Sequence, residues 1–114
     1  MASKPTKVKI GPQTFRIEFR NPTDDGMLSD GTQGYTLDQG NLIVIASTLS
    51  HSKQQVTLMH EILHAMRMIF ENSMPKRKAD YDEWEHFFIG VYENSFLMMM
   101  RDNPELVDWL TNEL

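Results

Sequence analysis

The chain has 114 residues, a length that suits one compact domain, and 40% of them are hydrophobic, enough to bury a core. Its formal net charge of −5 excludes an overall positive field that would attract nucleic acid, and the absence of cysteine excludes disulfides and thiolate metal ligands. No apolar run approaches transmembrane length, and the N-terminal residues lack a signal-peptide core. We therefore expect a single domain over residues 1–114, with residues 1–6 flexible, in the cytoplasm, and with no nucleic-acid or membrane partner.

Two alternating segments open the chain. Residues 7–10 and 15–20 alternate apolar and polar side chains, as strands with one buried face do, and residues 11–13 between them carry a turn signal. This pattern predicts a hairpin that covers one side of the core. Residues 21–34 are rich in Asp, Gly, Ser and Thr, which predicts a polar loop.

A second pair of strands is expected next. Residues 34–37 favour a strand that leads into a turn at residues 38–41. Residues 42–46 are continuously apolar, which is typical of a central strand that is buried on both faces. The N-terminal part is therefore expected to form a small, mostly antiparallel sheet.

A long helix is predicted over residues 52–72. Ser52 and Gln55 have the spacing of a capping box, no Gly or Pro interrupts residues 53–73, and Pro75 ends the helix. Apolar residues recur in this stretch at steps of three and four, which predicts a buried stripe made of Val56, Met59, Leu63, Met66 and Phe70.

This helix contains the pattern H-E-x-x-H, read as His60, Glu61 and His64. Two histidines four residues apart lie on one face of a helix, so their imidazoles can bind one metal ion, and the glutamate between them can act on a water beside it. The competing interpretation is that both histidines are core residues bonded to carbonyl groups and that Glu61 is a surface acid. The apolar flanks favour the metal site, because imidazoles at the edge of a buried stripe need a partner for each nitrogen.

Two further helices complete the chain. Asp80 or Asp82 can cap a helix that runs to about Met100, and Pro104 suits the first position of a last, short helix. The expected fold class is α+β: a small, mostly antiparallel N-terminal sheet, then two long helices and a short C-terminal helix.

A zinc site of this kind needs a third protein ligand, and Glu83, Glu85 and His86 are the candidates on the second long helix. Helix phase selects Glu85, with His86 as the next choice. Steps of three and four from Glu85 reach only apolar or aromatic residues, which predicts a buried stripe that also holds Phe88, Ile89, Tyr92, Phe96 and Met99. A carboxylate on such a face is costly unless it is paired or bound to a metal.

The chain resembles the ImmA/IrrE-like zinc metallopeptidase family, in particular its compact members encoded by bacteriophages and prophages. The resemblance covers most of the chain from Val8 onward and is strongest over residues 58–65, LMHEILHA, with a further likeness over residues 101–106, RDNPEL. The family's second helix often reads E-A-N-x-F-A, and residues 85–90 keep the acid, an apolar residue and a small residue but lack the Asn. The resemblance implies a minimal zincin-like α+β fold, one Zn²⁺, and peptidase activity on proteins such as transcriptional repressors.

The sequence thus predicts a zinc metalloendopeptidase of the H-E-x-x-H type. His60, His64 and Glu85 would bind Zn²⁺, and Glu61 would be the catalytic base. The substrate would be a peptide or protein, such as a host or phage regulatory protein, in the bacterial host cytoplasm if the chain is phage-encoded. Its identity and the oligomeric state stay open. So does the residue that stabilises the oxyanion, for which the candidates are Tyr35, His51, Tyr81 and Tyr92.

Two alternatives stay open beside this prediction. In the first, a phage-encoded metal-binding protein docks on a host protein, and its zinc is structural and closed by four protein ligands, for example by Glu85 and His86 together. In the second, the domain holds no metal and the histidines are ordinary core residues.

Overall fold

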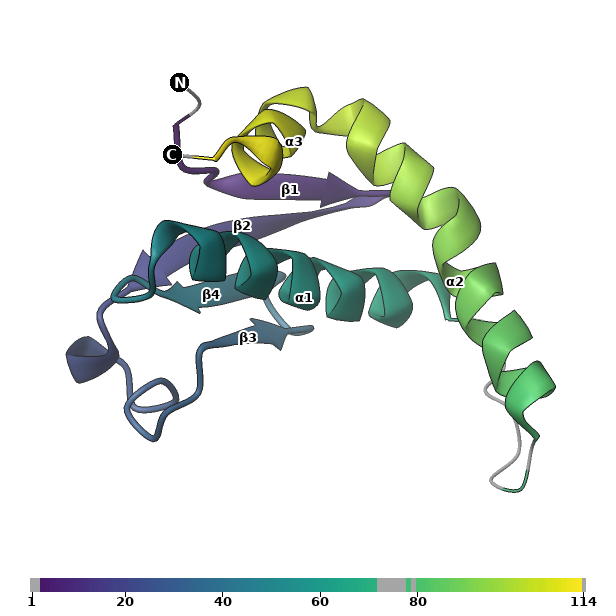
Figure 1. Cartoon of the computed structure of the whole chain (residues 1–114), viewed down its shortest axis with the longest axis horizontal. Coiled ribbons are helices and arrows are strands. Elements are labelled where there is room, and N and C mark those ends of the chain that lie inside the picture. The colour runs from purple at the N-terminus through teal and green to yellow at the C-terminus, as the bar shows by residue number, and fades with distance from the viewer. Residues whose placement is uncertain (1–2, 72–77, 79, 114) are drawn as a thin grey trace.

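The computed structural model describes residues 3–71, 78 and 80–113. Four strands come first and three helices follow, which confirms the predicted α+β class (Figure 1). The elements, in chain order, are β1 (Lys7–Ile10), β2 (Gln13–Arg20), the 3₁₀ turn η1 (Pro22–Asp24), β3 (Gly34–Leu37), β4 (Leu42–Ala46), α1 (His51–Phe70), α2 (Tyr81–Asp102) and α3 (Pro104–Thr111). None of the helices among these residues is long and apolar enough to cross a membrane.

The four strands form one mixed sheet in the order β1-β2-β4-β3. The pairs β1–β2 and β3–β4 are antiparallel, whereas β2 and β4 run parallel, with Ile17 opposite Ile43. The predicted central position of residues 42–46 is confirmed, and β3 lies at an edge of the sheet. The segment after β2 acts as a crossover, because parallel neighbours cannot be joined by a tight turn.

Both faces of β4 are buried, which explains its unbroken apolar sequence. Ile43 and Ile45 face the main core together with residues of β1, β2 and the helices. Leu42, Val44 and Ala46 face the other way and pack against Leu28 of the polar loop. The loop therefore covers the second face of the sheet at this strand.

The loop is held by a polar network around Asp25, whose side chain is buried. The Tyr35 hydroxyl donates to Asp25 Oδ2 at 2.6 Å, and Arg20 Nη1 donates to the same oxygen at 3.0 Å. Arg20 also donates to Glu18. The pKa of the Asp25 carboxyl group is lowered, and the hydrogen bond from Tyr35 is the largest cause. Burial acts in the opposite direction, and the hydrogen bond from Arg20 lowers the pKa further.

Helix α1 begins at His51, and its N-cap lies two residues earlier than predicted. Ser50 is the N-cap and accepts from Lys53 N, so the expected cap at Ser52 is wrong. The reason is tertiary: the Gln54 side chain donates to the carbonyls of Ser47 and Leu49, which binds the preceding turn to the helix.

The predicted buried stripe of α1 is confirmed in part: Met66 is buried, and Met59, Leu63 and Phe70 pack against the main core, whereas Val56 does not. Val56 is 71% exposed, while Met59 and Leu63 are only partly buried. The residues of α1 that the fold buries are Gln54, Thr57, Leu58, Glu61, Ile62, Ala65 and Met66. Apolar residues occupy more than one face of this helix, and the face that packs on the sheet is the one that includes the small residue Ala65.

Helix α2 begins after Asp80, whose side chain caps it by accepting from Glu83 N, and it contacts α1 and β1. Only Val91, Ser95 and Met99 of α2 are buried, the first at the middle of the helix and the other two in its C-terminal half. Figure 1 shows the other half extending away from the sheet.

The corner between α2 and α3 is fixed to the sheet by Asn103. Its amide accepts from Lys9 N at 2.8 Å and donates to Lys9 O at 2.7 Å, so it completes the ladder of the edge strand β1. Pro104 is at the first turn of α3, as predicted, and Leu106 and Trp109 of that helix are buried in the main core.

The N-terminal segment, residues 1–6, was expected to be flexible. The backbone oxygen of Thr6 accepts a hydrogen bond from Ile17 N at 2.8 Å, and residues 1–2 lie outside the described part of the chain.

Candidate metal centre

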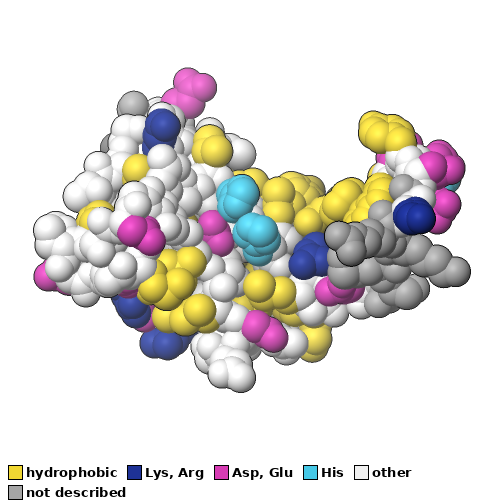
Figure 2. All heavy atoms as spheres, turned by 90° about the horizontal axis from the view of Figure 1, so that it is seen from below, with side chains coloured by type: hydrophobic (Ala, Val, Ile, Leu, Met, Phe, Trp, Pro, Cys, Tyr) yellow, Lys and Arg dark blue, Asp and Glu magenta, His cyan; other side chains and the backbone are white. Residues whose placement is uncertain are grey.

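Helix α1 places His60 and His64 on the same exposed side, one turn apart. Their Nε2 atoms are 3.1 Å from each other, and the ring centroids are 4.7 Å apart. Figure 2 shows two neighbouring histidine side chains in the middle of one face of the molecule, open to solvent. The predicted pairing of the two imidazoles by helix geometry is therefore present.

The separation of the two nitrogens can be compared with what a zinc ion requires. Two Zn–N bonds of about 2.05 Å that meet at a tetrahedral angle place their nitrogens about 3.3 Å apart. The observed 3.1 Å is close to this value. Without a cation the same contact requires a proton on one of the two nitrogens, because two lone pairs repel each other. The pair thus fits two of the positions of a tetrahedral site.

Glu61 lies beside this pair but on the inner side of α1, where it is 6% exposed. Its Oε1 accepts a hydrogen bond of 2.8 Å from the hydroxyl of Thr36 on the edge strand β3. The same hydroxyl lies 3.2 Å from the backbone oxygen of Glu61. Among the described residues no donor reaches Oε2, so this second oxygen is free to meet a water. Glu61 is a buried, oriented carboxylate, and the reading of Glu61 as a solvated surface acid is wrong.

Sequence reasoning did not identify Thr36, because nothing local connects it with a glutamate 25 residues later. A second unrecognised residue is Gly34, at the start of β3. A Cβ at Gly34 would lie 2.9 Å from Thr57 Cγ2 and 2.9 Å from Val44 O, so only glycine lets β3 approach α1 this closely. The close approach is what brings Thr36 to Glu61. The one signal in the sequence was the glycine that opens a predicted strand.

The structure does not bring the expected third ligand to the pair. Glu85 is exposed, and the prediction that it lies on a buried stripe of α2 is wrong. The buried residues of α2, which packs on α1 and β1, are instead Val91, Ser95 and Met99. Within residues 3–71, 78 and 80–113, no three His, Cys, Asp or Glu side chains are grouped to hold a metal.

The other candidates on α2 are exposed as well. Glu83 lies on the surface, and the His86 Nδ1 is 3.6 Å from the Asp82 carboxylate one turn earlier. Glu85 as a zinc ligand, with His86 as the next choice, stays a prediction from sequence.

Three of the four candidates for an oxyanion donor already have hydrogen-bond partners. Tyr35 bonds to Asp25, and His51 Nε2 lies 2.9 Å from Asn112 O with its ring against Trp109. Tyr92 donates to Leu63 O at 3.3 Å, on α1 beside His64, and burial raises its pKa. Tyr81 is 82% exposed at the start of α2.

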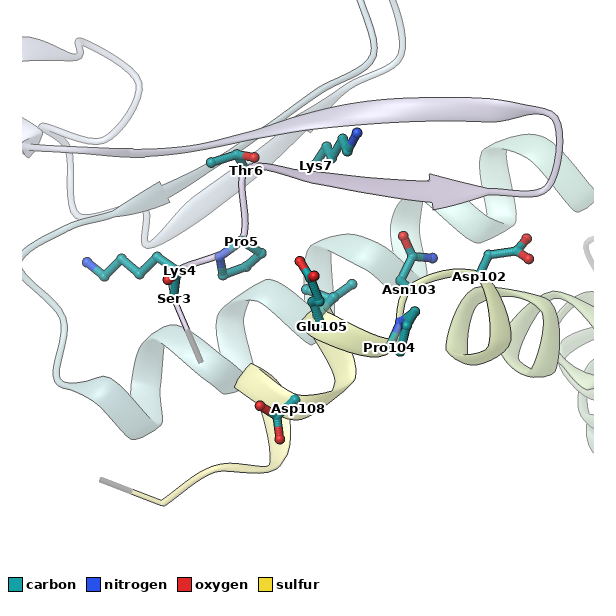
Figure 3. Close-up of a pocket in the computed structure, with 11 residues that line it drawn as sticks. Ser3, Lys4, Pro5, Thr6, Lys7, Asp102, Asn103, Pro104, Glu105 and Asp108 are labelled. Carbon is teal, nitrogen blue, oxygen red and sulfur yellow. The ribbon is translucent and has the colours of Figure 1, made fainter. Parts of the chain in front are cut away.

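A pocket of about 650 Å³ lies between the N-terminal segment and α3 (Figure 3). Lys4 and Lys7 line it on one side, and Asp102, Glu105 and Asp108 on the other. These charged side chains are all exposed, and none belongs to the H-E-x-x-H motif. The pocket therefore does not form part of the candidate metal centre.

Comparisons of this chain with known protein families, with curated proteins and with solved structures found no match.

Proposed function

We propose that this protein is a zinc-dependent peptidase whose reaction centre is His60, Glu61 and His64. The observation that carries the proposal is the convergence of the two Nε2 atoms, 3.1 Å apart on an exposed face. A buried carboxylate adjoins them and is oriented by Thr36. A pair of nitrogen ligands with a base beside it is the chemical equipment of a zinc hydrolase.

In the proposed reaction, a bound zinc ion would polarise the scissile carbonyl and make a water molecule nucleophilic near neutral pH. His60 and His64 would hold the ion through Nε2. Glu61 would take the proton of the attacking water at Oε2 and pass it to the leaving amine as the peptide C–N bond breaks. Thr36, by donating to Oε1, would keep the other carboxylate oxygen directed at the water.

The position of β3 suggests how a substrate would bind. β3 is at the edge of the sheet, with β4 on its other side, and it carries Thr36 next to Glu61. An extended peptide could add to this edge through backbone hydrogen bonds, which would hold it along the reaction centre. We propose a cytoplasmic protein substrate with an accessible extended segment, of the regulatory kind that the family resemblance implies.

The alternative function, a metal-binding protein whose zinc is structural, needs a closed site with four protein ligands. Both histidines of the pair are exposed, which leaves room beside them for water and for a substrate. The geometry therefore supports an open site better than a closed one.

The first experiment measures zinc in protein purified without a metal-affinity tag, together with the melting temperature as zinc is added. We expect one zinc per chain and a melting temperature that rises with zinc, because an ion at 100 times its Kd stabilises the folded state by about 2.7 kcal/mol. His64→Ala should abolish both effects. Met68→Ala, one turn further on the same exposed side, is the matched control and should keep them. Substoichiometric zinc with no thermal shift in the wild type would refute the proposal.

The third ligand is tested in the same assay with two neighbouring substitutions. We expect Glu85→Ala to weaken zinc binding more than His86→Ala. Loss in His86→Ala alone would reverse the assignment. No effect in either variant would place the third ligand elsewhere in the chain or in the substrate.

A further inference from the structure

The backbone of β3 holds Thr36 only through the residues on either side of it. β3 is the last strand of the sheet and pairs with β4 (Figure 1). Ala46 N donates to Gln33 O at 2.9 Å. Since alternate residues of an antiparallel strand bond to the same neighbour, Tyr35 and Leu37 bond to β4, while the N–H and C=O of Thr36 point to the free edge. The place of Thr36 therefore depends on how firmly its neighbours are held.

Tyr35, the residue before Thr36, is anchored on the opposite face of the sheet. Its ring packs on the apolar cluster that β4 and Leu28 form there. Its hydroxyl donates to Asp25 Oδ2 at 2.6 Å and accepts from Arg20 Nη1 at 3.1 Å. We call the bond between Tyr35 and Asp25 the clasp. It connects β3 with the loop over residues 21–33.

Both partners of the clasp are fixed by their surroundings. Asp25 is 8% exposed, its Oδ1 accepts from Met27 N at 2.9 Å, and its backbone oxygen accepts from Leu28 N and Ser29 N. Burial and the bond to Asp25 raise the pKa of Tyr35, so its phenol stays protonated near neutral pH and can donate. A hydrogen bond to an ionised carboxylate is also stronger than one between neutral groups. The clasp thus ties β3 to an acceptor that is itself held in place.

We propose that Tyr35 and Asp25 are positioning residues for Glu61. The clasp fixes the β3 backbone beside Thr36, and the Thr36 hydroxyl in turn directs Glu61 through its bond to Oε1. Neighbouring residues of a strand point to opposite faces, so the two contacts hold this edge strand from both sides. This inference rests on the proposed function, in which Glu61 is the catalytic base, but the orientation of the carboxylate can be measured without that reaction.

Two other roles for Tyr35 compete with this one. As a donor to the oxyanion, its hydroxyl would have to lie beside Glu61, yet it lies on the other face of the sheet and donates to Asp25. In a purely structural role, the clasp would only hold the loop to the sheet. Breaking it would then lower the stability of the fold and leave Glu61 as it was.

The first experiment measures the NMR chemical shift of the Glu61 carboxyl carbon in zinc-free protein. Tyr35→Phe keeps the ring and removes the hydroxyl, and we expect it to move this signal in the same direction as Thr36→Val does. Asp25→Asn keeps the shape of the acceptor without its charge and should act in the same direction. The control is Thr111→Val, which removes a threonine hydroxyl from α3 and should leave the signal in place. An unchanged Glu61 signal in Tyr35→Phe would overturn the proposal.

The second experiment is a double-mutant cycle of Tyr35→Phe and Thr36→Val, followed by urea unfolding. If the clasp holds Thr36 against Glu61, the threonine hydroxyl contributes less once the clasp is broken. We expect the folding equilibrium constant of the double variant to exceed the product of the separate effects by about threefold or more. The cycle of Tyr35→Phe with Thr111→Val should be additive. Additive effects in both cycles would contradict the coupling between the two faces of β3.

Hydrolysis separates this inference from the proposed function. With a peptide that the wild type cleaves, chosen from a library of blocked peptides, Tyr35→Phe should lower kcat and leave KM and the zinc content unchanged. A change in KM alone would assign Tyr35 to substrate binding instead. A wild type that cleaves no peptide would refute the proposed function, while the Glu61 signal and the cycle would still decide whether the clasp orients the carboxylate.

Discussion

Replacing Thr36 by valine or by serine tests the contact that orients the reaction centre. Valine has nearly the same shape as threonine and lacks the hydroxyl that donates to Glu61 Oε1 at 2.8 Å. Serine keeps the hydroxyl and loses only a methyl group. Because Thr36 is in a strand, both β-propensity and hydrophobicity favour valine over serine. Only the bond to the buried carboxylate favours serine.

The size of the effect follows from the burial of Glu61, which is 6% exposed. Hydrogen bonds to charged groups contribute about 1.5–3 kcal/mol, and a buried acceptor that loses its donor retains its desolvation cost. Against this, the lost methyl of serine and its lower strand propensity cost about 1 kcal/mol together. We therefore expect Thr36→Val to be less stable than Thr36→Ser by about 1 kcal/mol.

The assay is urea unfolding at pH 7 for the wild type and both variants, with the free energy of unfolding extrapolated to water. Each variant should retain zinc, since neither histidine is touched, while peptidase activity should fall in Thr36→Val and survive in Thr36→Ser. A valine variant as stable as the serine variant, or more stable, would show that the Thr36–Glu61 bond does not hold the carboxylate in solution.

Three further predictions follow from other parts of the structure. Glu61→Gln should keep zinc and the melting temperature but reduce peptide hydrolysis by about 10²- to 10⁴-fold, as loss of a general base does; simultaneous loss of zinc would mean that Glu61 holds the metal site together. The same variant can trap the substrate in a pull-down. Gly34→Ala should lower the free energy of unfolding by about 1–3 kcal/mol, because its Cβ would meet Val44 O and Thr57 Cγ2 at 2.9 Å, whereas Gly26→Ala, with nothing within 4 Å, is the control and should change little. Asp25 has a lowered pKa in the folded state, so its contribution to stability is complete above the ordinary aspartate pKa of about 3.9 and is lost as the pH falls through the folded value. Melting temperatures from pH 7 to pH 2 should therefore fall less steeply for Asp25→Asn than for the wild type, and parallel curves would contradict this reasoning.

The parts of the fold that depend on near neighbours were predictable. The strands, the helices and the α+β class follow from period and turn signals that act over a few residues. The histidine pair belongs here too: positions four apart on a helix meet as soon as the helix exists, so His60 and His64 needed no knowledge of the remaining chain.

The contacts that join distant segments were not predictable in this way. The apolar residues of α1 surround more than one side, so periodicity could not choose between the face of Val56 and the face of Leu58 and Ile62. The same ambiguity led to the wrong assignment of Glu85 to a buried face of α2. Aromatic residues lie on more than one side of this helix, and the domain buries only Val91, Ser95 and Met99 of it. The parallel pairing of β2 with β4 could not be predicted either, because the sequence of one strand does not specify which strand lies beside it.

The residue pattern of this protein thus determines the H-E-x-x-H pair, whereas the packing of β3 on α1 determines what surrounds it. Thr36 reaches Glu61 across 25 residues of sequence because Gly34 leaves room for the strand to approach the helix. Which side of a helix is buried is settled by the free energy of packing against its neighbours, and that free energy exists only once the sheet and the helices have come together.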